Sequence, residues 1–210
     1  MSESEPEVVY RNLVLAIPYR GGVITSEILT PEKLSSRLIQ SGYATIQGER
    51  KSTDVRGAAH IIMVMIASGA KVMGKSADFA GLIASIYNTN GKGDHLLEVV
   101  LVLPAEPTSH ISKVYDVAKR GYANMRLDYR IYDIFMCEVP AHVLVPLHEI
   151  MTSDEITTLC RTYYLSPEQF PAILPGDPAS AWWGIRPGMM VRIHRHSETA
   201  GFAIAYRHCR

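Results

Sequence analysis

Residues 60–67 read His-Ile-Ile-Met-Val-Met-Ile-Ala, and seven of these side chains in a row are apolar. A short apolar run is typical of a strand that is covered on both faces of its sheet. A similar run, residues 96–103, follows a segment with helical apolar spacing, residues 77–87. Residues 109–122 then predict another helix, and residues 131–137 predict a third strand. This order predicts an α/β layer with right-handed connections and a mostly parallel sheet at its core.

Local signals upstream of this run predict one further helix. Thr30 is a good N-cap, Pro31 suits the first helical position, and Gly42 ends the segment. Residues 1–7 are acidic and polar. They predict a disordered start rather than a secretory or transit signal.

Residues 141–210 predict short helices followed by a β-hairpin. Helix-start signals stand at Thr152 with Glu155, at Ser166 with Gln169, and at Asp177 before Pro178, and Gly184 can end the third helix in a left-handed conformation. Apolar residues then alternate with polar or small ones over residues 191–194 and 202–206. The hairpin loop between these strands is expected to be tight and polar, at residues 195–201.

A domain boundary is expected near residue 140. Every lysine lies before it, and Pro140 and Pro146 flank a short connector. The sequence therefore predicts two units, residues 1–140 and residues 141–210.

The composition excludes several classes of protein. Lysine plus arginine and aspartate plus glutamate both number 21, so an autonomous nucleic-acid binder, which needs a basic excess, is not expected. The three cysteines, Cys137, Cys160 and Cys209, are widely spaced and form neither a disulfide framework nor a paired metal motif. The longest apolar run is too short to span a bilayer. We therefore expect a soluble intracellular protein.

Residues 69–76 match the phosphate-loop pattern Gly-x-x-x-x-Gly-Lys-Ser. In a true phosphate loop Lys75 would reach the γ-phosphate and Ser76 would bind magnesium. No strand ends in the aspartate that the metal needs, and Ser76 has an ordinary alternative role as a helix N-cap. A small nucleotide-binding enzyme using residues 69–76 is therefore the alternative hypothesis.

Other catalytic patterns are weaker still. His194 and His196 lie on one side of a strand but have no third ligand at a recognisable spacing. Trp182 and Trp183 could stack on a base or sugar but are more often core residues in a short helix. No catalytic residue, metal site or cofactor is therefore expected.

Several blocks between residues 142 and 210 resemble one known family in order and spacing. They are His142-Val143-Leu144-Val145-Pro146-Leu147-His148, then Leu165, Gln169, Pro171 and Ile173, then Asp177-Pro178, Gly184-Ile185, Arg186 and Gly188, then Val191-Arg192-Ile193, Arg195, Ser197-Glu198-Thr199-Ala200-Gly201 and Tyr206-Arg207. This set resembles the fifth subunit shared by eukaryotic nuclear RNA polymerases, whose C-terminal domain corresponds to a separate small subunit of archaeal RNA polymerase. Residues 61–64, 71–72, 75–76 and 97–103 fall where the N-terminal domain of the eukaryotic subunit, the jaw, has similar elements.

The resemblance implies an α/β fold in two domains. An N-terminal α/β jaw domain, residues 1–140, has a mostly parallel or mixed sheet. A small C-terminal mixed α/β assembly domain, residues 141–210, ends in a β-hairpin.

The resemblance also implies a function. The chain would be a non-catalytic structural subunit of a DNA-dependent RNA polymerase, present in one copy per enzyme. The assembly domain would dock on the largest subunit, and the jaw would lie near downstream DNA and contact it weakly, only in the complex. No membrane contact is implied.

Departures from the family pattern bear on the setting of the polymerase. They occur at Ala172, Arg186-Pro187 and His196, and they point to a lineage-specific paralogue or a viral copy. The expected location is the nucleus, with the nucleolus for a subunit of RNA polymerase I and a viral factory for a viral copy.

The implied docking surface lies on the hairpin and the segments beside it. Its partner-binding residues are expected to be His142, Val145, Pro146, His148, Asp177, Gly188, Arg192, Arg195, Ser197, Glu198, Thr199, Gly201, Tyr206 and Arg207. The hairpin region also carries Arg210, and its arginines face only Glu198 in the sequence, which suits carboxylates of a partner. Gly201 is expected to adopt a backbone conformation that favours glycine.

Overall fold

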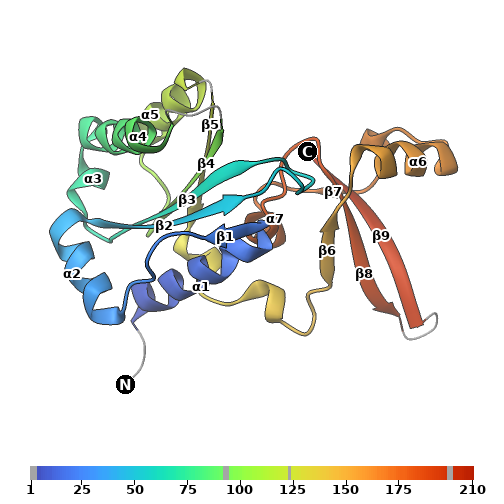
Figure 1. The fold of residues 1–210 in the computed structure, drawn as a ribbon, viewed down its shortest axis with the longest axis horizontal. Helices are drawn as coiled ribbons and strands as arrows, with labels where there is room; N and C mark the ends of the chain where they lie inside the picture. The colour runs from blue at the N-terminus through green and yellow to red at the C-terminus, as the bar shows by residue number, and fades with distance from the viewer. Residues whose placement is uncertain (1–3, 92–94, 123, 198–200) are drawn as a thin grey trace. The chain divides into compact units, whose positions relative to one another are not determined.

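The computed structural model describes residues 4–91, 95–122, 124–197 and 201–210. The chain divides into two compact units, Met1–Cys137 and Glu138–Arg210. Figure 1 shows the elements of both units.

A five-stranded mixed sheet forms the centre of the first unit. Its strands lie in the order β1 (Gly22–Ile24), β2 (Tyr43–Arg50), β3 (Ala59–Ile66), β4 (Leu96–Leu103) and β5 (Met125–Ile131). β1, β2 and β3 pair antiparallel, whereas β3, β4 and β5 pair parallel. The α/β class is therefore confirmed, and the parallel part of the sheet is limited to its last three strands.

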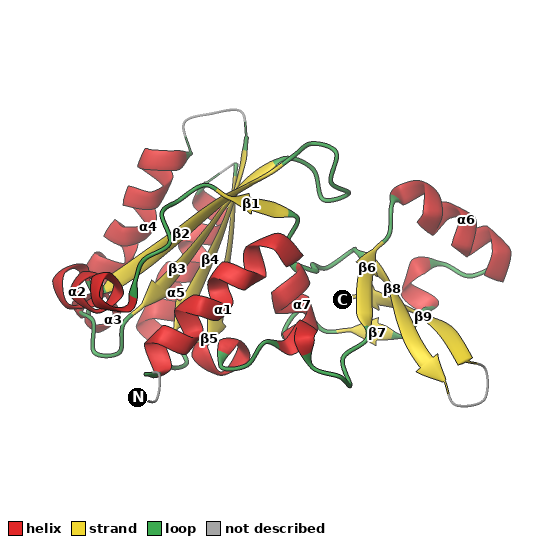
Figure 2. Ribbon diagram, turned by 60° about the horizontal axis from the view of Figure 1, so that its bottom comes forward, coloured by secondary structure: helices red, strands yellow, loops and turns green. Residues whose placement is uncertain are grey.

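Helices cover both faces of this sheet (Figures 1 and 2). The helices of the unit are α1 (Glu5–Tyr19), α2 (Pro31–Ser41), α3 (Lys71–Gly74), α4 (Ser76–Asn90) and α5 (Ser109–Gly121). α4 and α5 pack on one face with β3 and β4, and α1 packs on the other through Leu13 and Ile17. Because β3 and β4 are buried on both faces, their sequences are almost continuously apolar.

Most of the expected elements of this unit are confirmed. The strands expected at residues 60–67 and 96–103 correspond to β3 and β4, the helices expected at residues 77–87 and 109–122 correspond to α4 and α5, and Gly42 ends α2 with a φ of 78°.

Two expectations for the first unit are wrong. The strand expected at residues 131–137 lies earlier, at Met125–Ile131, and a 3₁₀ helix, Tyr132–Phe135, follows it. β5 is an edge strand whose charged residues obscured its apolar pattern. α1 begins at Glu5 within the segment expected to be disordered, of which residues 1–3 lie outside the described residues. Ser4 and Glu7 form a capping box there, and the sequence alone could have shown it.

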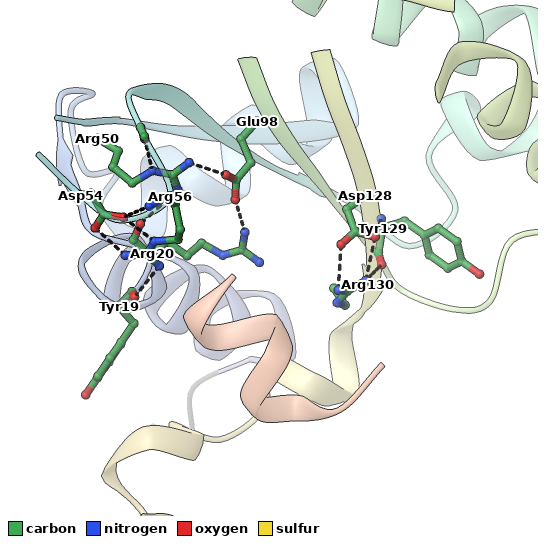
Figure 3. A network of polar contacts seen from close by, with 10 residues as sticks. Tyr19, Arg20, Arg50, Asp54, Arg56, Glu98, Asp128, Tyr129 and Arg130 are labelled. Atoms are coloured by element: carbon green, nitrogen blue, oxygen red, sulfur yellow. Dashed lines mark hydrogen bonds and ion pairs between the residues drawn. The ribbon is translucent and has the colours of Figure 1, made fainter. Parts of the chain in front are cut away.

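A buried ionic network joins distant segments of the first unit (Figure 3). Glu98 on β4 accepts from Nη1 of Arg20 at 2.5 Å and from Nη2 of Arg50 at 3.0 Å. All three side chains are at most 6% exposed. Beside them, Arg56 pairs with both oxygens of Asp54 and donates to the carbonyl of Tyr19. The network thereby ties the end of α1 to β2, β4 and the β2–β3 loop.

The second unit is built on a four-stranded sheet. Its strands lie in the order β6 (Leu147–Ile150), β8 (Met190–Ser197), β9 (Gly201–Cys209) and β7 (Ala172–Ile173), and its helices are α6 (Ser153–Tyr163) and α7 (Pro178–Trp183), with 3₁₀ helices at Val139–Ala141 and Pro167–Gln169. β8 pairs antiparallel with β6 and β9, and β7 pairs parallel with β9. This mixed sheet confirms the α/β description of the C-terminal part.

The helix-start signals of the second unit are confirmed. The Thr152 hydroxyl accepts from the Glu155 amide at 3.2 Å, and the Glu155 carboxylate accepts from the Thr152 amide at 2.8 Å. Asp177 caps α7 by accepting from the amide of Ala179. Gly184 ends α7 with a φ of 65°.

We expect the two units to unfold separately, with the ionic network stabilising only the first. Glu98→Gln should lower the unfolding free energy of the first unit by about 3–5 kcal/mol, because two buried arginines lose their counter-charge. Both tryptophans, Trp182 and Trp183, lie in the second unit. Urea unfolding should therefore show a shifted circular-dichroism transition and an unchanged tryptophan-fluorescence transition.

The control is Glu27→Gln, which removes an exposed pair with Lys33 and should leave both transitions in place. Equal shifts of the two signals in Glu98→Gln would contradict separate unfolding.

Candidate functional site

The register of the second sheet sorts its side chains onto two faces. Residues opposite one another in β6, β8 and β9 share a face. The first face, which we call the α7 face, carries His148, Val191, Ile193, Arg195, Ala203, Ala205 and Arg207. The second, which we call the α6 face, carries Leu147, Glu149, Arg192, His194, His196, Phe202, Ile204 and Tyr206.

His148 is the centre of the α7 face. Its ring lies 4.9 Å from that of Trp183 on α7, and its Nδ1 donates to the carbonyl of Pro146 at 2.8 Å. Burial lowers the pKa of His148, and Asp177, Arg207 and Arg195 lie close enough to act on its charge. The structure therefore gathers Pro146, His148, Asp177, Arg195 and Arg207, five of the residues singled out from the sequence.

Arg192 on the α6 face is occupied within the chain, contrary to the expectation that the hairpin arginines face only Glu198. Its guanidinium bonds Glu149 at 3.1 Å and Glu155 at 2.8 Å, and these contacts raise its pKa. His194 Nε2 also lies 3.1 Å from Glu149. Strand pairing and α6 bring these carboxylates from segments distant in the sequence, so the sequence-based reasoning missed them. Arg192 thus links the sheet to α6.

Tyr206 also has a structural role. Its ring packs edge-on against Phe170 and Tyr163, at centroid distances of 6.4 and 6.3 Å. It joins the apolar cluster of Met151, Leu159, Phe170 and Met190 beneath α6.

The far end of the α6 face carries three exposed apolar side chains beside His194 and His196. Leu147, Ile204 and Phe202 are 60%, 52% and 64% exposed. Leu147 and Ile204 both lie opposite His194, and Phe202 lies opposite His196. The alternation of residue types in the sequence predicted the strands. It did not predict which part of this face is left exposed, because that depends on how far α6 extends over the sheet. We call Leu147, Ile204 and Phe202 the apolar stripe.

The remaining expected residues lie around this sheet. His142 is exposed and accepts from the Leu144 amide, and Val145 is half-buried. Gly188 has a φ of 88° and donates to the carbonyl of Cys209. Gly201 has a φ of 69°, which confirms its glycine-favouring conformation.

The expected loop at residues 195–201 is shorter than the sequence suggested. β8 continues to Ser197, whose backbone pairs with Gly201. Glu198 and Thr199 lie outside the described residues.

Residues 69–76 do not fold as one phosphate-binding loop. Gly69 makes a turn with a φ of 72°, α3 occupies the middle of the segment, and Lys75 is extended. Lys75 rather than Ser76 is the N-cap of α4, so the expected capping role of Ser76 is wrong by one residue.

Two other kinds of site are absent from the described residues. Within residues 4–91, 95–122, 124–197 and 201–210, no three His, Cys, Asp or Glu side chains are grouped so that they could hold a metal ion. No helix of the described chain is long and apolar enough to cross a membrane.

Comparison with known proteins identifies the C-terminal unit. Residues 137–209 match the family described as RNA polymerase Rpb5, C-terminal domain. RNA polymerase subunit Rpo5 of Nitrosopumilus maritimus is 40% identical over 70 residues, which span 33% of this chain and 84% of that subunit. The chain belongs to the Rpb5 family of RNA polymerase subunits.

Other Rpb5 relatives extend the match. The RPB5 homolog of African swine fever virus (isolate Tick/South Africa/Pretoriuskop Pr4/1996) is 25% identical over 193 residues, 91% of this chain and 90% of the viral protein. Subunit RPABC1 of RNA polymerases I, II and III of Caenorhabditis elegans is 43% identical over 94 residues, 43% of this chain and 44% of that subunit. The family resemblance noted in the sequence is therefore confirmed.

We expect His148 to make the stability of this Rpb5 chain depend on pH. Burial lowers the pKa of His148 in the folded chain, so the folded state favours the neutral ring. The contribution of the neutral ring to stability is fully present above the ordinary pKa of about 6.5, and it is lost as the pH falls through the folded pKa. His148→Phe should therefore reduce the loss of unfolding free energy between about pH 7.5 and about pH 5.5. Urea unfolding monitored by tryptophan fluorescence measures this loss.

His142→Gln is the matched control, because the His142 side chain is exposed and should leave the loss as it is in the wild type. An equal loss in His148→Phe and wild type would contradict the assignment.

Proposed function

We propose that this Rpb5-family chain is a non-catalytic structural subunit whose second unit is the assembly domain and docks on the largest subunit of its RNA polymerase. The observation that carries the proposal is the apolar stripe, three large side chains more than half exposed on one face of a small sheet. Val143 and Leu144, 92% and 81% exposed, precede β6 and add apolar surface. Surfaces of this kind are typical of sites that a partner protein covers.

The α7 face adds a charged component to this docking surface. Arg195 is exposed, Arg207 is half-buried, and both act on the same buried histidine. Guanidinium groups at an interface favour a partner with carboxylates and set its orientation. Arg195 and Arg207 lie on the opposite face of the sheet from the apolar stripe, so the proposed partner reaches both only by passing around the edge of β9.

The first unit is the jaw in this proposal, and it approaches downstream DNA only within the assembled polymerase. Arg20, Arg50, Arg56 and Arg130 are paired with Glu98, Asp54 and Asp128 and contribute little to an outward basic field. Lys71 and Lys75, which are exposed and follow the carboxyl end of β3, are two candidates for phosphate contacts.

The relatives support a polymerase of viral or similarly diverged type. The alignment with the African swine fever virus homolog extends over 91% of this chain, whereas that with the nematode subunit covers 43%. The chain would then act in a viral factory, or in the nucleus if its polymerase is nuclear. Identification of the proteins that co-purify with a tagged chain tests this setting.

Docking is tested by charge placed on the stripe. Leu147→Asp should weaken binding of the full chain to the largest subunit by about tenfold or more, because a desolvated carboxylate replaces an apolar contact. Ile39→Asp is the control: Ile39 is 85% exposed on α2 of the jaw and should not affect docking. Co-purification and titration measure the effect. If Ile39→Asp lost binding while Leu147→Asp kept it, the interface would lie on the first unit and the proposal would be wrong.

The DNA proposal makes a different prediction. The free chain should bind duplex DNA no better than about 10⁻⁴–10⁻⁶ M, the non-specific level at physiological salt. In the assembled polymerase, the pair Lys71→Glu and Lys75→Glu should reduce the salt-sensitive part of downstream-DNA binding, measured by fluorescence anisotropy. Lys33→Glu serves as the control on α2. Nanomolar binding by the free chain would overturn the proposal.

A further inference from the structure

One edge of β9 is open along most of its length. β8 pairs with β9 from Gly201 to His208, whereas β7 pairs only with His208 and Cys209. Among the described elements of the second unit, Figures 1 and 2 show none beside the far half of β9 other than β8.

The hydrogen bonds at the end of β9 show which residues face this edge. The amide of Cys209 donates to Met189 on the β8 side, and the amide of His208 donates to Pro171 on the β7 side. Because this direction alternates along a strand, Phe202, Ile204 and Tyr206 point their N–H and C=O groups away from β8. Within the part of the chain that the structure describes, these six groups have no hydrogen-bond partner.

The jaw shows how the same chain closes an edge. On edge strand β5, the Tyr115 hydroxyl donates to the carbonyl of Leu127 at 3.1 Å. Asp128 accepts from the amide of Tyr129 at 3.0 Å, and Arg130 donates to the Tyr129 carbonyl at 2.7 Å. Burial raises the pKa of Tyr115, so its hydroxyl keeps the proton that it donates. Side chains thus satisfy three outward backbone groups of β5 and protect it from another strand.

β9 lacks such protection. Residues 201–206 read Gly-Phe-Ala-Ile-Ala-Tyr, without a proline or a charged residue, and residues 201–204 are exposed. A long apolar edge of this kind is a template for strand addition, and natural proteins that leave one open commonly use it to bind an extended peptide.

We propose that β9 receives an extended segment of the largest polymerase subunit as a further strand beside residues 202–206. This inference rests on the proposed docking function and specifies its geometry. The added strand spans about 17 Å, the length of five extended residues. It ends where β7 begins to pair, at His208.

The side chains of β9 define the chemistry of that segment. On the α6 face, Phe202 and Ile204 offer apolar contacts to every second residue of the incoming strand. On the α7 face, Ala203 and Ala205 are small, and Arg195 and Arg207 lie beside them. The segment therefore alternates apolar residues with residues that include a carboxylate. A second copy of this chain is less suitable, since it would bring Arg195 and Arg207 of both copies onto one face.

Ile204→Pro distinguishes strand addition at the edge of β9 from side-chain contact with the α6 face only. Proline removes the outward N–H of residue 204 and leaves the β8 ladder intact, whereas Ile204→Ala removes only the side chain. We expect Ile204→Pro to bind the largest subunit about tenfold more weakly than Ile204→Ala. Equal binding by the two variants, with Leu147→Asp still defective, would overturn strand addition and leave the docking proposal standing.

Amide hydrogen exchange of the wild-type chain gives a test that needs no variant. In the free chain the amides of Phe202, Ile204 and Tyr206 should exchange faster than those of Ala203 and Ala205, which face β8. Binding of the largest subunit should slow the first three. Unchanged exchange of these three amides in the complex would refute the proposal. Slow exchange of the same amides in a free chain that sediments as a dimer would also refute it, because a second copy of the chain would then be the added strand.

Discussion

β8 pairs with β6 on one side and with β9 on the other, and both registers run without a bulge. This constraint decides the face on which every side chain of the three strands lies, because a shift of one residue would exchange the two faces. It places His148 against Trp183, Arg192 beside Glu149, and the apolar stripe beyond the cover of α6. The proposed docking surface and the unpaired edge of β9 both depend on it.

Ion pairing, and not the overall composition, decides which charged side chains of this protein are available to a partner. A net charge of zero excludes a strong overall field, but it does not show which charges remain available. In the first unit, Glu98 holds Arg20 and Arg50 in the interior, where removal of one partner is costly. In the second unit Arg192 is held by two glutamates, whereas Arg195 is exposed. Arg195 and Arg207 are therefore better candidates for a partner than Arg192.

The phosphate-loop match illustrates the difference between a pattern of letters and a site. Residues 69–76 have the required glycines, lysine and serine between a strand and a helix. A phosphate site also needs consecutive amides that point at one anion. A helical turn over Lys71–Gly74 and the extended Lys75 do not supply a continuous loop.

Local sequence determined the ends of many elements. Thr152 with Glu155, Asp177 before Pro178, and Gly184 act on backbone groups within four residues, so their effect can be read directly. The apolar runs at residues 61–67 and 96–103 likewise predicted two buried strands, because the pattern lies within one short segment of sequence. The shift of the third strand to Met125–Ile131 could not be read in this way, because its alternating charges are tolerated only at the edge of the sheet. Tertiary structure alone decided that Glu149 reaches Arg192 across 43 residues and that β7 stops short on β9. Both outcomes depend on contacts between segments that are distant in the sequence. Long-range packing and strand register decide those contacts, and neighbouring residues do not.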